Sequence, residues 1–143
     1  MLDTNVAVSA LAWRGMPYRL LQAIRHQPET VQLYSSEALL AELAGVLARP
    51  HLRKPLAAID RTPAEVLTDY AASMEIVAPT EIPRVIVNDP DDDHVLACAL
   101  TARAEAIVSG DRHLLALQPQ WRDIDILTAA QAVERIEQLR RER

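Results

Sequence analysis

The stretch DPDDDHVLACALTARAEAIVSGDR, residues 89–112, decides the fold class. Its first half places acidic residues in front of the apolar run VLACAL, which is typical of a helix start because a helix N-terminus stabilises negative side chains. Its second half ends an apolar run, residues 106–109, at Gly110 and Asp111, which predicts a buried strand followed by a turn. A helix, a buried strand and a carboxylate where the strand stops are typical of an α/β protein.

Strand and helix patterns alternate over the whole chain. Helices are predicted at residues 17–26, 36–47, 62–73, 91–102 and 111–117 and after Thr128, and both Thr62 and Thr128 have capping-box spacing. Strands are predicted at residues 1–8, 31–34, 74–78, 106–109 and 124–127, with a short extended piece at 85–87. This alternation predicts one α/β domain over residues 1–143, with a parallel sheet covered by helices on both faces.

The composition excludes several classes of protein. Half of the 143 residues are hydrophobic but only 3% are aromatic, so the core is aliphatic. The net charge of −5 argues against a general nucleic-acid coat protein, but a nuclease stays possible because a bound divalent metal supplies positive charge. The basic residues of the segment 49–54 fit a solvated loop or a contact with a nucleic-acid backbone. Cys98 is expected to be a buried thiol, and the absence of a signal or membrane pattern predicts a cytoplasmic protein.

Four acidic residues are candidates for a shared site. Asp3, Asp93 and Asp111 can each be explained singly as a turn or helix-cap residue, and Glu42 as a solvated residue at the margin of an apolar stripe. The carboxyl ends of neighbouring parallel strands meet at one sheet edge, which would bring Asp3 and Asp111 together. Clustered carboxylates repel one another unless a cation or proton joins them, and Mg²⁺ and Mn²⁺ prefer carboxylate oxygens. The histidines are scattered along the chain, so zinc is not expected.

Three segments in order resemble the PIN domain (PilT N-terminus) family, which includes VapC-like toxins and metal-dependent ribonucleases. They are LDTNVAVSAL (2–11), SSEALLAELAGVLARP (35–50) and DPDDDHVLACALTARAEAIVSGDRHLL (89–115). The resemblance implies a three-layer α/β/α fold with a central parallel sheet of about five strands. It implies one or two Mg²⁺ or Mn²⁺ ions held by the catalytic residues Asp3, Glu42, Asp93 and Asp111, with Asn5, Ser109 and Asp91 in support. His113 stands where the family often has another Asp.

The resemblance also implies a function. We expect a metal-dependent endoribonuclease that hydrolyses single-stranded RNA, the toxin of a type II toxin–antitoxin system. Its partners would be RNA, a small antitoxin that inserts a basic side chain among the acids, and a second copy in a homodimer, with no membrane involved. One alternative is a catalytically weak nucleic-acid-binding PIN module without a toxin role. Another is a metal-dependent phosphatase or small-molecule phosphohydrolase, which fits the acids but not their linear order.

Overall fold

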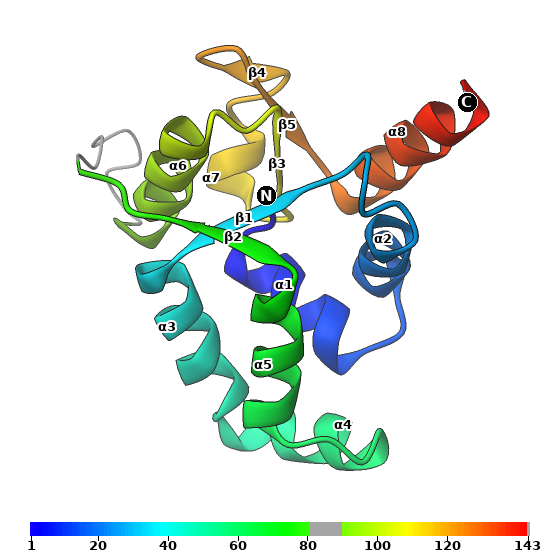
Figure 1. Ribbon diagram of the computed structural model, residues 1–143. Helices are drawn as coiled ribbons and strands as arrows, with labels where there is room; N and C mark the ends of the chain where they lie inside the picture. The colour runs from blue at the N-terminus through cyan, green and yellow to red at the C-terminus, as the bar shows by residue number, and fades with distance from the viewer. Residues whose placement is uncertain (81–89, 143) are drawn as a thin grey trace.

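The computed structural model describes residues 1–80 and 90–142, and at residues 90 and 91 it describes the backbone alone (Figure 1). The strands are β1 (Leu33–Ser36), β2 (Met74–Val77), β3 (Ala106–Val108), β4 (Gln120–Trp121) and β5 (Ile124–Leu127). The helices are α1 (Thr4–Ala12), α2 (Met16–Arg25), α3 (Glu37–Leu47), the 3₁₀-helix η1 (Pro50–Leu52), α4 (Arg53–Ala58), α5 (Pro63–Ala72), α6 (Pro90–Ala102), α7 (Arg112–Leu115) and α8 (Ala129–Arg141).

The strands form two hydrogen-bonded sheets within the described residues, in the orders β1-β2 and β3-β5-β4. β1 pairs in parallel with β2, with Leu33 opposite Met74, and β3 pairs in parallel with β5, with Ala106 opposite Asp125. The two-residue strand β4 pairs antiparallel with β5. The predicted α/β class with parallel pairing is confirmed, but β4 departs from the all-parallel sheet because the tight turn after Trp121 reverses the chain.

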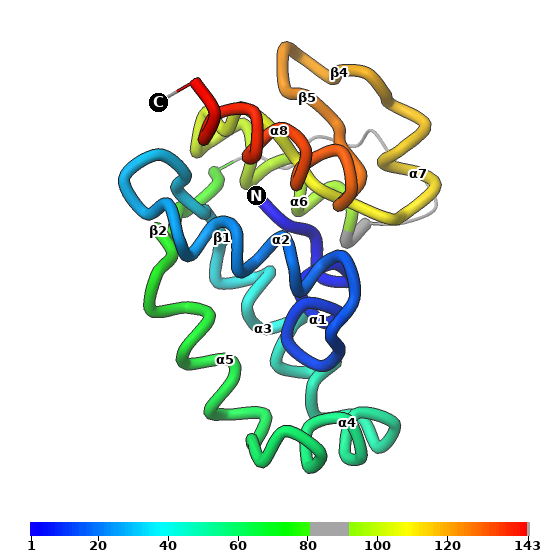
Figure 2. The backbone as a smooth tube through the Cα atoms, turned by 90° about the vertical axis from the view of Figure 1, so that its right-hand side faces the viewer, coloured from blue at the N-terminus to red at the C-terminus, as the bar shows by residue number. Residues whose placement is uncertain are grey.

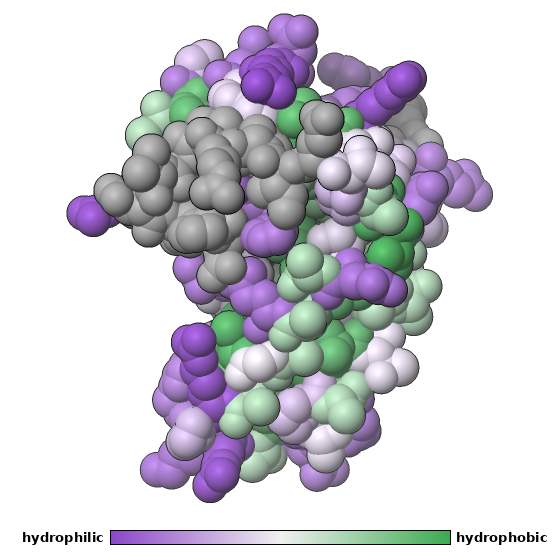
Figure 3. Space-filling model, turned by 90° about the vertical axis from the view of Figure 1, so that its left-hand side faces the viewer, coloured by the Kyte–Doolittle hydropathy of each residue, from purple (hydrophilic) through white to green (hydrophobic). Residues whose placement is uncertain are grey.

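Helices pack on both sides of the strands (Figure 1). In this view α1, α3 and α5 lie on one side of β1 and β2, and α6 and α7 lie on the other. Figure 2 shows α8 alongside α2, and these two helices make extensive contact. Figure 3 shows the opposite side of the molecule, where hydrophobic and hydrophilic residues are interspersed on the lower part of the face. Two aliphatic clusters fill the interior, one among the helices around α1 and α2 and the other between α6, β3 and β5.

The N-terminal segment differs from its prediction. Residues 1–8 were expected to form a strand, but only Leu2 makes a β-bridge, which is parallel to Val108, and α1 begins at Thr4. The helix starts early because the Asp3 side chain caps it by accepting a hydrogen bond from the Val6 amide at 2.9 Å. The β-branched residues Val6 and Val8 suggested a strand, yet both are buried helix residues. Asp3 therefore comes directly after a residue that pairs with β3, but its side chain caps α1.

The other boundaries shift less. The strand expected at residues 31–34 is β1 at Leu33–Ser36. Of the basic residues of segment 49–54, Arg49 lies in the connection between α3 and η1, and the others lie in η1 and the start of α4; all are exposed. The extended piece expected at residues 85–87 lies outside the described residues. Cys98 is fully buried, as expected, and burial raises the pKa of its thiol to about 11. Among the described helices, none combines the length and apolar character that crossing a membrane requires.

Candidate metal centre

A small acidic pocket lies where the start of α1 meets α3, α6 and α7. Its volume is about 60 Å³. We call it the acidic pocket, and it is lined by Asp3, Thr4, Asn5, Glu42, Asp92, Val95 and Asp111. Segments more than a hundred residues apart in the sequence thus place carboxylates around one space.

Asp3 is held firmly at the base of this pocket. Its side chain is 3% exposed, and its backbone amide donates to the Val108 carbonyl at 3.0 Å. One carboxylate oxygen caps α1 through Val6, and the other accepts a hydrogen bond from the hydroxyl of Ser109. Burial raises the pKa of Asp3, and the charge of Asp111 adds to this, whereas the hydrogen bonds from Ser109 and Val6 oppose it. The ionised carboxylate is therefore costly here without a nearby positive charge.

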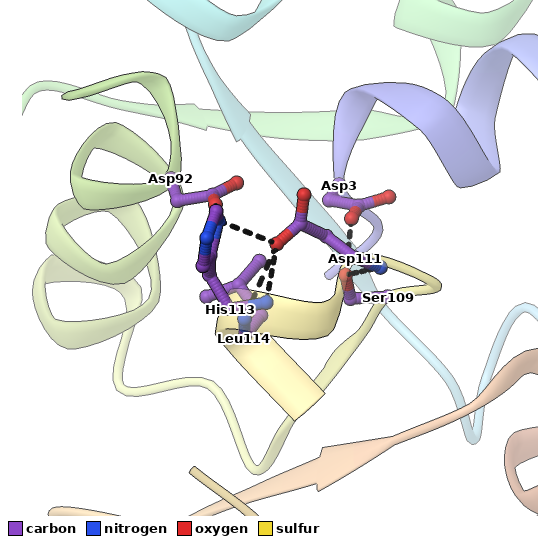
Figure 4. Close-up of polar contacts among 6 residues, drawn as sticks. All are labelled: Asp3, Asp92, Ser109, Asp111, His113 and Leu114. Carbon is purple, nitrogen blue, oxygen red and sulfur yellow. Dashed lines mark hydrogen bonds and ion pairs between the residues drawn. The ribbon is translucent and has the colours of Figure 1, made fainter. Parts of the chain in front are cut away.

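Asp111 is positioned by the end of β3. Its amide donates to Ser109 Oγ at 2.9 Å, so one buried serine orients both Asp3 and Asp111. Oδ1 of Asp111 caps α7 by accepting from the amides of His113 at 2.7 Å and Leu114 at 3.4 Å. Figure 4 shows the second carboxylate oxygen directed toward the space between Asp92 and Asp3. Ser109, expected as a supporting residue, thus contacts two of the candidate ligands.

At the third acidic position two neighbouring aspartates are buried. Asp92 lines the acidic pocket, whereas Asp93, which was expected at the metal, is buried without lining the pocket, and its role as a ligand stays a prediction. Consecutive residues of α6 are turned by about 100° about the helix axis, so the two aspartates point in different directions. Val95, one turn after Asp92, lines the same pocket.

The remaining expected residues are placed as follows. Glu42, half-buried on α3, lines the acidic pocket as expected, although its position in the middle of a helix gave little indication of this. Asn5 also lines the pocket, from an exposed position in the first turn of α1. The side chain of Asp91 lies outside the described residues.

His113 is a neighbour of the site that the sequence interpretation did not count among the ligands. Its Nδ1 lies 3.5 Å from Asp111 Oδ1 and 3.9 Å from Asp92 Oδ2 (Figure 4). Ligand atoms of these three residues all lie within 4.8 Å of one another. The four histidines are scattered in the sequence. His113, however, follows Asp111 by only two residues, at the start of α7, and this spacing could have identified it as a neighbour of the site.

The donor set fits a divalent cation. The carboxylates of Asp3, Glu42, Asp92 and Asp111 line the acidic pocket, and none of its described lining residues is basic. A cation bound among them would offset the mutual repulsion and the desolvation that raises the pKa of Asp3. Oxygen donors of this kind suit Mg²⁺ or Mn²⁺.

Comparison with known proteins agrees with this arrangement. A family model described as PIN domain matches residues 1–113, which include all four acidic residues of the pocket. No curated protein and no solved structure gives a significant match to the chain. PIN domains are generally nucleases and typically use a divalent metal. Because the matched residues make up most of the 143-residue chain, this protein belongs to the PIN domain family.

Proposed function

We propose that this protein is a metal-dependent endoribonuclease that hydrolyses phosphodiester bonds of single-stranded RNA. The observation that carries the proposal is the convergence of Asp3, Glu42, Asp92 and Asp111 on one pocket in a PIN domain chain. In this proposal the four side chains hold one or two Mg²⁺ or Mn²⁺ ions.

The surrounding residues suit this chemistry. A cation held by these carboxylates would supply positive charge for the phosphate and would favour deprotonation of a water molecule at neutral pH. Ser109 and the amides of α7 hold Asp3 and Asp111 in fixed positions, so little rearrangement is needed at the moment of reaction. One of the carboxylates accepts the proton of the attacking water. Asn5, exposed at the pocket, offers an amide group to a phosphate oxygen.

The proposal is tested by cleavage of fluorescently labelled single-stranded RNA. We expect cleavage with Mg²⁺ or Mn²⁺, loss of cleavage in EDTA, and loss in the Asp111→Asn variant at the same metal concentration. Equal cleavage by wild type and Asp111→Asn would remove the acidic pocket from the reaction. RNA binding without cleavage under any metal condition would favour the catalytically weak binding module.

The hydroxyl of Ser109 gives a second prediction. In Ser109→Ala, Asp3 loses a hydrogen bond that lowers its pKa, so protons compete with the cation at higher pH than in wild type. Removing such a supporting hydrogen bond weakens metal affinity by about 10- to 100-fold. Titration of Mn²⁺ by calorimetry at several pH values measures this, with the exposed Ser73→Ala as the control. An unchanged affinity and pH profile would contradict it.

The toxin role is part of the proposal and rests on the resemblance to VapC-like PIN proteins. An antitoxin that inserts a basic side chain into the acidic pocket would neutralise the same carboxylates that a cation does. A homodimer and a cytoplasmic location are proposed on the same ground. A short open reading frame for a DNA-binding protein next to the gene would support the toxin role, and its absence would count against that role alone.

A further inference from the structure

A second pocket, of about 230 Å³, lies near the other end of α1, where α1 meets α2 and α5. Three arginines line it, Arg14, Arg25 and Arg61, together with a single acidic residue, Asp69. We call it the arginine pocket. In a chain of net charge −5, this is a local concentration of positive charge.

The arginines differ in how far their charge is already neutralised. Arg61 donates a hydrogen bond to Asp69 and lies 3.8 Å from Glu65. Arg14 and Arg25 have no carboxylate within ion-pair distance in the part of the chain that the structure describes. Arg14 is therefore available for an anion, and so in part is Arg25, whose charge also acts on Asp69. A guanidinium matches a phosphate group with paired N–H donors.

Aromatic side chains adjoin these arginines. The guanidinium carbon of Arg14 lies 4.2 Å from the centre of the Tyr18 ring, and Gln22 Nε2 donates to the Tyr18 hydroxyl at 2.8 Å. The neighbouring Trp13, at the end of α1, is 44% exposed. Of the five aromatic residues in the chain, Tyr18 thus lies against Arg14, and Trp13 is the neighbour of Arg14 in the sequence. Arginines next to exposed aromatic faces are typical of surfaces that bind single-stranded nucleic acid, because bases stack on the rings.

The arginine pocket and the acidic pocket share α1. Thr4 lines the acidic pocket and Leu11 lines the arginine pocket. These residues are separated by two helical turns, or about 10 Å along the axis of α1. The helix between them is mostly buried, so α1 holds the two pockets at this spacing from inside the fold.

We propose that the arginine pocket binds a phosphodiester group of single-stranded RNA at a position away from the bond that is cleaved. Arg14 and Arg25 contact the phosphate, and Trp13 offers its ring face to an adjacent base. The proposal extends the ribonuclease function proposed above and rests on it for the identity of the ligand. An acidic peptide would satisfy the arginines but would leave the exposed indole ring without a stacking partner.

The test measures binding separately from cleavage. Fluorescence anisotropy in EDTA follows a labelled RNA of about 12 nucleotides, within the usual site size of single-strand binding proteins. We expect the double variant Arg14→Gln/Arg25→Gln to bind about 10-fold or more weakly. The slope of log Kd against log salt should fall by about 0.7 for each phosphate group that the variant no longer neutralises. Arg19→Gln, an exposed arginine of α2 outside the pocket, is the matched control and should bind as wild type. Thermal melting verifies that all variants are folded.

The outcomes separate this proposal from the proposed function. Equal affinity and salt slope in wild type and double variant, or no RNA binding by wild type, overturn the arginine-pocket proposal even if RNA is cleaved. Arginine-dependent binding without any cleavage supports the arginine pocket and removes the nuclease assignment. A labelled oligoglutamate peptide that binds through Arg14 and Arg25, where RNA does not, also overturns the proposal and identifies an acidic protein segment as the ligand.

Discussion

Asp92→Asn is expected to lower the rate of RNA cleavage by on the order of 100-fold or more, because it removes one charged oxygen donor from the acidic pocket. Asp93→Asn is the matched control, since it makes the same change at the next residue of the same helix. Asp93, expected from the sequence at the metal, is buried without lining the pocket, so the comparison shows which of the two neighbouring carboxylates the reaction needs. The pair therefore tests the orientation of α6 as well as the role of the carboxylate.

The measurement is the single-turnover rate of cleavage at saturating Mn²⁺, with the melting temperature of each variant recorded. Loss of activity in Asp93→Asn at unchanged Tm, with Asp92→Asn active, would contradict the orientation of α6. Loss in both variants at unchanged Tm would mean that the two carboxylates act together. Titration with Mn²⁺ adds a readout that does not depend on RNA, because only Asp92→Asn should weaken metal binding.

Asp3→Asn is expected to raise the stability of the metal-free protein at neutral pH and to abolish its stabilisation by Mn²⁺. Burial raises the pKa of Asp3, so the folded protein is most stable, with respect to this group, when the carboxyl is protonated. That contribution is fully present below the unfolded pKa of 3.8 and is lost as the pH rises through the higher folded pKa. Asparagine stays neutral at every pH and caps a helix as well as aspartate does.

The measurement is thermal unfolding between pH 3.5 and 8, with and without Mn²⁺. Without metal, the difference in Tm between variant and wild type should be small at the lowest pH and should grow as the pH rises. At Mn²⁺ near 100 times Kd, wild type should gain about 2.7 kcal/mol, which corresponds to roughly 5–10 °C in Tm. The variant should gain little. A wild-type protein that is more stable than Asp3→Asn in EDTA at neutral pH would show that the carboxylate is compensated by the protein itself.

Local sequence signals predicted most helices of the fold. The capping boxes at Thr62 and Thr128 define the starts of α5 and α8, and both side chains accept the expected amide hydrogen bonds. The strand predicted at residues 1–8 was wrong, because the side chain of Asp3 caps a helix that begins at Thr4. The strand β4 was missed because two residues, Gln120 and Trp121, carry no recognisable period of their own.

The candidate site was predictable in kind but not in every residue. Asp3 and Asp111 follow from the rule that parallel strands present their carboxyl ends at one edge, and Ser109 lies between them. The choice between Asp92 and Asp93 depends on how α6 is rotated about its axis, which a run of three aspartates does not encode. The position of His113 and the arginine pocket depend on packing between elements, so the linear pattern contained little information about either.

The contact between Asp3 and Ser109 joins residues that the ribosome makes at different times. Ser109, the hydroxyl donor to Asp3, is made 106 residues after it. At about 5–20 residues per second, several seconds separate the synthesis of these two partners. The acidic pocket therefore cannot be assembled around Asp3 until the segment that carries Ser109 and Asp111 has also been made.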